Sequence, residues 1–399
     1  MNNLIQEGQA KRNIICIYIY TFFQTFILFY AVDTLFYIQR GLNSSQYISF
    51  IIIVNIIKII FEIPSGIIAD KYGKKKMLMI STVLFFIEIL LFIVSKNYIM
   101  FAITMAISGI EQAFRTGIAN SIIYESLKDK KKFNKALLYN SICFDLSYMI
   151  AMILGGYIAE KYNFVSTYYL TLIPIILAFV ILFGIKDIQG NNDDTEKLAV
   201  SKLEILKNAF NKLLSIKGLA NIFILSSVMY SAIKIVEDSH PEYAQNIGIS
   251  VFYIGIYTSL ILVISIVGSY IGSNMKEKTK SIALNINSLI IGVLIMSMGI
   301  LNNVYGIVCL LAIYIFSESY ENVMLEHIHN KIDSKSRVTV ESIYGFVYSF
   351  ISIIMSLVLT VVLKFLPLNN VYTIVGIFLI VFTLICILFR IKNNYKTQN

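Results

Sequence analysis

The sequence predicts an all-α integral membrane protein with twelve transmembrane helices in two six-helix bundles. Of its 399 residues, 57% are hydrophobic and 14% are charged, and the mean hydropathy is +0.74. Soluble domains carry about 25% charged residues, so this composition excludes a soluble enzyme, a disordered chain and a secreted disulfide scaffold. A spanning helix needs about 20 mostly apolar residues, and the chain is long enough for twelve of them joined by short loops.

Twelve apolar stretches divide the chain, and each is long enough to cross a membrane once. They lie at residues 13–37, 46–69, 77–95, 98–123, 136–159, 164–186, 218–239, 250–272, 281–301, 304–325, 338–364 and 370–391. An even number of spans puts both ends of the chain on one side of the membrane. The first stretch is too long for the apolar part of a signal peptide, so we expect it to remain as a span.

Lysine and arginine are concentrated on one side of the predicted spans. Of the 33 basic residues, 26 lie in the terminal segments and in loops on that side, and only Arg40, Lys96 and Lys161 lie in the opposite loops. Basic loops face the cytoplasm, so we expect both termini there, in a multi-pass protein of a bacterial-type cell membrane. The basic residues form short clusters and no broad domain, so nucleic acid is not expected as a partner.

The longest polar interval separates two groups of six spans. It predicts an N-terminal bundle at 1–186, a cytoplasmic linker at 187–217, and a C-terminal bundle with a short tail at 218–399. The linker stretch SKLEILKNAFNKLL is either an amphipathic helix on the membrane surface or a plain tether.

A faint internal repeat supports this division into two bundles. Glu125 and Glu326 are separated by the same number of residues as Ser141 and Ser342. Each pair flanks a basic loop that leads into the next span. This pattern favours a duplicated bundle with pseudo-twofold symmetry, as transporters have.

The loop between the second and third spans has the most specific pattern, FEIPSGIIADKYGKKKMLMIS at residues 61–81. Gly66 permits close helix contact, and Gly73 permits a tight turn. Asp70 can accept hydrogen bonds from a neighbouring helix N-terminus or pair with a base. The lysines at 74–76 hold the loop at the inner membrane surface.

This loop resembles the signature G-x-x-x-D-[RK]-x-G-[RK]-[RK] of the major facilitator superfamily in both position and spacing. The matching residues are Gly66, Asp70, Lys71, Gly73, Lys74 and Lys75. The resemblance implies a transporter in which they form a cytoplasmic gate, with Asp70 docked near the start of span eleven when the protein opens outward. The counterpart in the second half has Lys276 where an aspartate would align.

Two further stretches resemble bacterial drug-efflux permeases of this superfamily. Span four ends FRTGIANSIIYESL, so Arg115 maps onto the arginine that the family associates with proton coupling. The stretch SRVTVES at 336–342 resembles the family's R-A-T-x-x-S segment. Span five has Gly155 and Gly156 but lacks the proline-containing glycine motif that is typical of drug antiporters.

Thirteen ionisable residues fall inside the predicted spans, where an unpaired charge costs about 2.5–3.5 kcal/mol. They are Asp33, Lys58, Glu62, Glu88, Glu111, Arg115, Asp145, Lys234, Glu237, Asp238, Glu318, Glu321 and Lys364. Most must lie near an interface, pair with one another or face water. Three pairs lie four residues apart and can meet on one helical face: Lys58 with Glu62, Glu111 with Arg115, and Lys234 with Asp238.

Some of these residues are candidates for a proton or substrate pathway: Glu111, Arg115, Asp145, Glu318, Lys58 and Glu62. Glu111, Arg115 and Asp145 can converge, because spans four and five are neighbours in sequence. Protonation of a carboxylate would then release Arg115 and shift the conformational balance. The alternative is an ion network that only fixes the helix register. Candidates for pocket lining are Gln24, Tyr30, Tyr148, Tyr230 and Tyr314.

No cofactor or metal is expected. The sequence has no nucleotide-binding P-loop, zinc motif or nucleophile elbow, and its four cysteines have no CxxC spacing. His240, His327 and His329 lie near span ends, where we expect them to be exposed and not to act as ligands. These absences argue against an enzyme and favour an ion gradient, of protons, as the energy source.

The resemblance and the mid-membrane carboxylates together imply a secondary transporter that works by alternating access as a monomer. We expect it to export a small apolar or cationic compound in exchange for protons. Proton-coupled uptake of a small nutrient is the alternative mechanism. A non-transporting membrane sensor is the alternative from a different class, but the loops are too short for the soluble domain that a sensor usually carries.

Overall fold

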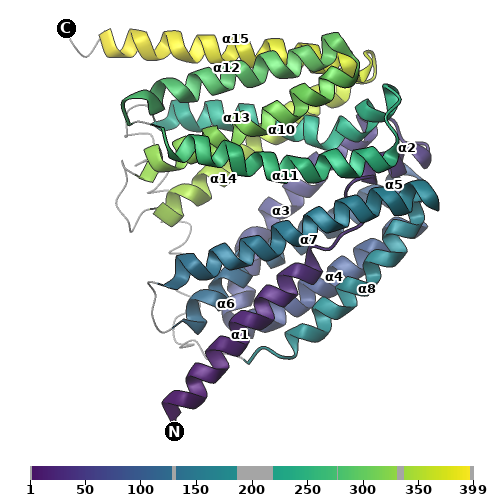
Figure 1. Ribbon diagram of the computed structural model, residues 1–399, viewed down its shortest axis with the longest axis vertical. Helices are drawn as coiled ribbons and strands as arrows, with labels where there is room; N and C mark the ends of the chain where they lie inside the picture. The colour runs from purple at the N-terminus through teal and green to yellow at the C-terminus, as the bar shows by residue number, and fades with distance from the viewer. Residues whose placement is uncertain (1, 128–131, 187–218, 276, 330–336, 396–399) are drawn as a thin grey trace. The chain divides into compact units, whose positions relative to one another are not determined.

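The computed structural model describes residues 2–127, 132–186, 219–275, 277–329 and 337–395. These residues form α-helices joined by short loops, with no strand among them (Figure 1). The all-α fold is therefore confirmed, whereas the predicted linker at 187–217 lies outside the described residues.

The helices follow the predicted spans in order, with two helices each for spans one and four. The first half contains α1 (Asn2–Gln24), α2 (Asp33–Gln39), α3 (Ser44–Tyr72), α4 (Lys74–Val94), α5 (Tyr98–Arg115), α6 (Ile118–Ser126), α7 (Phe133–Lys161) and α8 (Phe164–Leu182). The second half contains α10 (Leu219–Asn246), α11 (Val251–Ser273), α12 (Glu277–Leu301), α13 (Val304–His329), α14 (Arg337–Val362) and α15 (Leu368–Tyr395).

Nine of the helices in the described ranges are long and apolar enough to cross a membrane on their own. The predicted spans that are not among them are the first, the fourth and the seventh. The tenth span, α13, is the least apolar of the nine.

The chain packs as two compact units. One comprises Met1–Leu42, Ile53–Val200 and Ser250–Ser259, and the other comprises Asn43–Ile52, Ser201–Ile249 and Leu260–Asn399. In the first unit α4 packs against α5 and α8, and α1 packs against α6, α7 and α8. In the second, α12 lies between α13 and α15, and α10 packs against α14. The predicted division differs from these units at two helix starts. The start of α3 belongs to the second unit, and the start of α11 belongs to the first.

Span one was expected to be continuous over 13–37, and this expectation is wrong. The helix ends at Gln24 and resumes at Asp33. The hydroxyl of Thr25 bonds back to the carbonyl of Thr21 at 2.8 Å, a contact that destabilises and bends helices. Such a break is tolerated inside a membrane only where the freed backbone groups find partners within the protein.

The broken segment is held from both sides. The backbone N–H of Leu28 donates to the hydroxyl of Thr171 at 3.1 Å, and the ring of Phe29 stacks on that of Tyr168 with centroids 4.2 Å apart. On α7, Gly155 leaves room for the carbonyl of Leu28, which would overlap any Cβ at that position. The segment between the two helices is in this way mostly buried inside the first unit.

Span four, expected to be continuous over 98–123, is also interrupted. The α5 helix ends at Arg115, and α6 begins at Ile118. Between them Gly117 has a φ of +75°, a left-handed conformation that glycine adopts without the strain a Cβ would bring. The sequence F-R-T-G contains the signal for this break, because a glycine after a β-branched residue is a common helix terminator.

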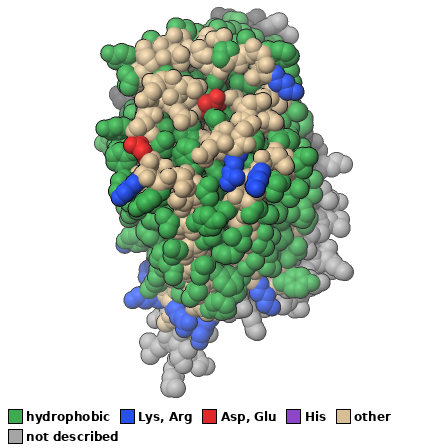
Figure 2. All heavy atoms as spheres, turned by 90° about the vertical axis from the view of Figure 1, so that its right-hand side faces the viewer, with side chains coloured by type: hydrophobic (Ala, Val, Ile, Leu, Met, Phe, Trp, Pro, Cys, Tyr) green, Lys and Arg blue, Asp and Glu red, His purple; other side chains and the backbone are tan. Residues whose placement is uncertain are grey.

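Hydrophobic side chains cover most of the surface that Figure 2 presents, and charged side chains are scattered or lie toward its lower end. This distribution is typical of a protein whose exposed surface meets lipid tails.

We expect Gly155→Ala to lower the free energy of unfolding by about 1–3 kcal/mol, because the added methyl group overlaps the Leu28 carbonyl. Thermal unfolding in detergent measures the loss. Gly345→Ala in α14 is the matched control, since a methyl group there would meet nothing within 4 Å and alanine favours helix. Equal losses in the two variants would contradict the close packing of the broken segment.

Candidate functional site

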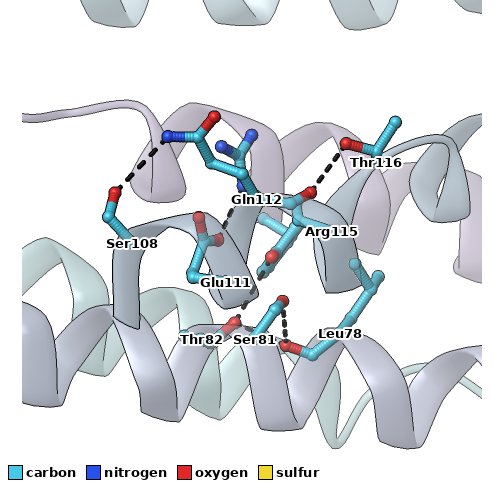
Figure 3. Close-up of polar contacts among 9 residues, drawn as sticks. Leu78, Ser81, Thr82, Ser108, Glu111, Gln112, Arg115 and Thr116 are labelled. Atoms are coloured by element: carbon cyan, nitrogen blue, oxygen red, sulfur yellow. Dashed lines mark hydrogen bonds and ion pairs between the residues drawn. The ribbon is translucent and has the colours of Figure 1, made fainter. Parts of the chain in front are cut away.

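An ion pair between Glu111 and Arg115 lies at the end of α5, next to the break in span four. The Nε of Arg115 is 2.8 Å from Oε1 of Glu111, which confirms that this pair meets on one helical face (Figure 3). The carboxylate is 3% exposed and the guanidinium side chain is 38% exposed. The charge of Glu111 is therefore buried, and that of Arg115 reaches an open space.

The terminal nitrogens of Arg115 have no acceptor among the described residues, since only Nε donates, to Glu111. A guanidinium that faced hydrocarbon would cost several kcal/mol. Its planar fork matches carboxylate and phosphate geometry and also binds water. This end of Arg115 is therefore available to bind water or a ligand.

A second carboxylate, Glu88 of α4, belongs to the same cluster. It is 5% exposed, and its Oε2 has no hydrogen-bond partner in the described part of the chain. Glu111 and Arg115 both act on it electrostatically. At 1.5 Å per residue, Glu88 is roughly 20 Å from the start of α4, and Glu111 is roughly 20 Å from the end of α6. Two buried carboxylates thus lie at similar depth beside one guanidinium.

The sequence prediction did not assign Glu88 to this pathway, although a signal was present. The antiparallel order of spans three and four places two residues at the same depth when they are equally far from the paired ends, Lys74 and Glu125, as Glu88 and Glu111 are. Figure 3 shows the outcome for its neighbours: Ser81 and Thr82 of α4 lie beside Glu111 and Arg115 of α5.

Three predicted pocket residues lie on or near span one. Tyr30 is in the broken segment, and its ring centroid is 6.1 Å from that of Tyr148 on α7. The charges of Arg115 and Glu88 act on the Tyr30 hydroxyl, so the tyrosine belongs to the surroundings of the ion pair. Gln24 ends α1, and its buried Oε1 has no partner among the described groups. Tyr30 therefore borders the cluster from the side of span one.

Two predicted contacts are absent from the described structure. Lys58 and Glu62 are neighbours on α3, but no ion pair joins them, and Glu62 is exposed. Asp145 on α7 has no hydrogen bond or ion pair with Glu111 or Arg115. The predicted convergence of Asp145 with that pair therefore stays a prediction.

The second unit has a charge cluster of its own on α10. Lys234 lies 2.8 Å from Asp238, which confirms the predicted pair, and 3.4 Å from Glu237. His240, expected to be exposed, is 4% exposed instead, because α10 continues through Pro241 to Asn246 and keeps it inside the packed helices.

The remaining candidates of the second unit lie on α10 and α13. The Tyr230 hydroxyl donates to the carbonyl of Ser317 at 3.2 Å. The Ser269 hydroxyl is 3.4 Å from Oε2 of Glu318, and Tyr314 precedes Glu318 by one helical turn. The structure thus brings Tyr230, Tyr314 and Glu318 onto two adjoining helices.

The predicted gate loop forms a tight turn between α3 and α4. Gly73 has a φ of +94°, as expected for the residue that permits the turn. Lys74 pairs with Glu125 at the end of α6, and Lys75 donates to the carbonyl of Ile185 at 2.7 Å. Gly66 lies on α3, whereas the side chains of Asp70 and Lys71 are outside the described parts.

The second unit repeats one of these contacts. Lys280 near the start of α12 pairs with Glu326 near the end of α13, in the same relation as Lys74 to Glu125. The two glutamates are the pair that indicated the internal repeat. Across the described residues no group of three or more His, Cys, Asp or Glu side chains could hold a metal ion.

Comparison with solved structures supports the fold. A POT family transporter, in complex with a thioalcohol-conjugated peptide, superposes with a TM-score of 0.75 at 15% identity, covering 96% of each chain. The nucleoside transporter NupG gives 0.72 at 14% identity, over 95% of this chain and 98% of that one. A D-xylose–proton symporter gives 0.68 at 16% identity, over 94% and 96%.

Sequence relatives match over shorter lengths. An uncharacterized MFS-type transporter of Methanocaldococcus jannaschii is 25% identical over 246 residues, which is 60% of each chain. An uncharacterized transporter of Buchnera aphidicola is 24% identical over 151 residues, covering 38% of this chain and 35% of the relative. The matches therefore span about a third to three-fifths of these relatives.

The apolar helices define a multi-pass membrane protein, and the relatives that match its sequence are described as transporters. The family model of the Major Facilitator Superfamily matches residues 14–388, so the chain belongs to that superfamily.

The two matched ion pairs should differ in strength. The Lys280 side chain is 5% exposed, whereas that of Lys74 is 23% exposed. Removal of a partner from a buried charge costs about 3–5 kcal/mol, whereas an exposed pair contributes about 0–1 kcal/mol. We expect Glu326→Gln to destabilise the protein more than Glu125→Gln does, as measured by thermal unfolding. Equal effects, or the reverse order, would contradict the difference in burial.

Proposed function

We propose that this transporter is driven by protons, and that the proton binds at Glu88 and Glu111 beside Arg115. The observation that carries the proposal is a pair of buried carboxylates next to a single guanidinium whose terminal nitrogens are open. Two neighbouring carboxylates and one cation are electrically balanced only when one carboxylate holds a proton. A group that must carry a proton to remain buried is suited to coupling transport to a proton gradient.

Proton transfer at this site would change its binding properties. When Glu111 is ionised, it holds Nε of Arg115 at 2.8 Å. When the proton moves from Glu88 to Glu111, the ion pair weakens, Arg115 is released, and Glu88 becomes an anion that favours a cationic partner. A proton and a cationic compound would then compete for one negative charge, which is the requirement for exchange.

The charge balance inside the predicted spans favours a cationic or neutral substrate. Nine of the thirteen ionisable residues there are acidic and four are basic. We propose export of a small apolar or cationic compound, with Asp145 and Glu318 as further proton or substrate groups. The gate loop with Asp70 would control access from the cytoplasm.

Uptake is the second candidate. One solved structure similar to this chain is described as a D-xylose–proton symporter, and others are peptide and nucleoside transporters. At 12–16% identity these likenesses concern the fold, so the direction of transport has to be measured.

Inverted membrane vesicles with an acidified interior separate the two directions. With an exporter, an added substrate enters the vesicle as protons leave, so the internal pH rises. With an uptake symporter, the entering compound brings protons with it, and the internal pH does not rise. We expect members of a panel of cationic compounds to raise the internal pH only in vesicles that contain the protein. A pH response to none of them would contradict proton exchange with cations.

We expect Glu111→Gln and Glu88→Gln each to reduce this compound-driven pH change by about a hundredfold, the effect of losing a proton-transferring group. Lys96→Gln, in an exposed loop, is the control for removing a charge, and it should retain the full response. If Glu111→Gln and Glu88→Gln express normally and retain the wild-type response, the proposed proton site is wrong.

We also propose that both termini lie in the cytoplasm of a bacterial-type cell, as the distribution of basic residues indicates. Alkaline phosphatase is active only outside the cytoplasm, and green fluorescent protein folds best inside it. Fusions at either end should therefore be fluorescent and without phosphatase activity. Opposite results at the two ends would contradict an even number of spans.

A further inference from the structure

Two helices begin in one compact unit and continue in the other. Residues 44–52 of α3 belong to the second unit, and the rest of α3 belongs to the first. Residues 251–259 of α11 belong to the first unit, and the rest of α11 belongs to the second. These helices are spans two and eight, so the same division occurs once in each half of the sequence.

The start of α3 is held by Glu242, near the end of α10. The hydroxyl of Ser44 lies 2.8 and 2.9 Å from the two carboxylate oxygens, and the hydroxyl of Tyr47 donates to one of them at 2.5 Å. Ser45 adds a hydrogen bond of 2.6 Å to the carbonyl of Thr360 in α14. All these contacts lie within the second unit.

The start of α11 is held by Glu160, next to the last residue of α7. Its carboxylate accepts a hydrogen bond of 2.7 Å from the backbone N–H of Phe252. Ser259 donates to the carbonyl of Met149 at 2.8 Å. These contacts lie within the first unit.

In both places a carboxylate is bonded to the first turn of the helix that it holds. A helix N-terminus favours negative charge, because its first N–H groups are free and the helix dipole is positive there. A hydrogen bond to a charged acceptor is about twice as strong as one between neutral groups. Each glutamate therefore makes a contact that is strong but consists of only a few bonds, so it can form and break as a unit.

Alternating access moves one bundle or repeat against the other, and a helix shared by two units must then bend or release its first turns. We propose that Glu242 and Glu160 are positioning residues of the transport cycle. In the present conformation they hold the starts of α3 and α11, and both starts leave their glutamates when the protein changes conformation. This role concerns the conformational change alone and does not depend on which ion or compound is carried.

Hydrogen–deuterium exchange of the full-length protein in lipid nanodiscs tests the proposal without a substrate. We expect Glu242→Gln to speed amide exchange about tenfold at 44–52, where its own contact is weakened. Exchange should rise as well at 251–259, because both starts are released in one conformational change. Glu160→Gln should produce the same two increases. Exchange within α12, which belongs to one unit, should not change.

An increase confined to the segment beside the substituted glutamate would reduce Glu242 and Glu160 to local contacts and overturn the proposal. An increase that includes α12 would mean general unfolding and would also contradict it. Lys96→Gln controls for the removal of a charge and should leave both segments unchanged.

Discussion

The high cost of an uncompensated charge in hydrocarbon governs how this protein is arranged. Lipid can solvate neither a carboxylate nor a free backbone N–H, so each must find its partner within the protein or in water. The described structure meets this requirement in two ways. Glu111 is paired along its own helix with Arg115, which is near a second carboxylate. Where pairing is incomplete, as at Glu88, the residue becomes a candidate for holding a proton.

The same constraint connects the broken helices to the charge cluster. A helix break inside a membrane exposes backbone groups that must be bonded or hydrated, so breaks are confined to places where polar partners already exist. Spans one and four are interrupted beside Tyr30 and Arg115, whose side chains border the same cluster. Discontinuous helices of this kind commonly form the binding sites of secondary transporters. The breaks and the charges therefore occur together in the first unit.

Sequence alone predicted those features that depend on spacing along a single helix. Glu111 with Arg115 and Lys234 with Asp238 were predicted correctly, because a separation of four residues fixes their proximity once the helix forms. Lys58 and Glu62 have the same spacing, but no ion pair joins them in the described structure, because a separation of four residues permits a contact without requiring it. The positions of Asp145 and Glu88 depend on how each helix is rotated against its neighbours, which spacing along one helix cannot specify.

The two halves of the chain agree in their end contacts and differ in their interior charges. Lys74 with Glu125 and Lys280 with Glu326 occupy corresponding positions, as do the divided helices α3 and α11. The interior charges do not correspond. The first unit has two buried carboxylates around an arginine, whereas the second has Lys234 between two acidic neighbours on α10. A movement of two similar halves needs matched contacts at their ends, but a substrate without twofold symmetry needs different groups on its two sides. A duplicated bundle that carries both proton and substrate is therefore expected to keep its end contacts similar and to diversify its interior.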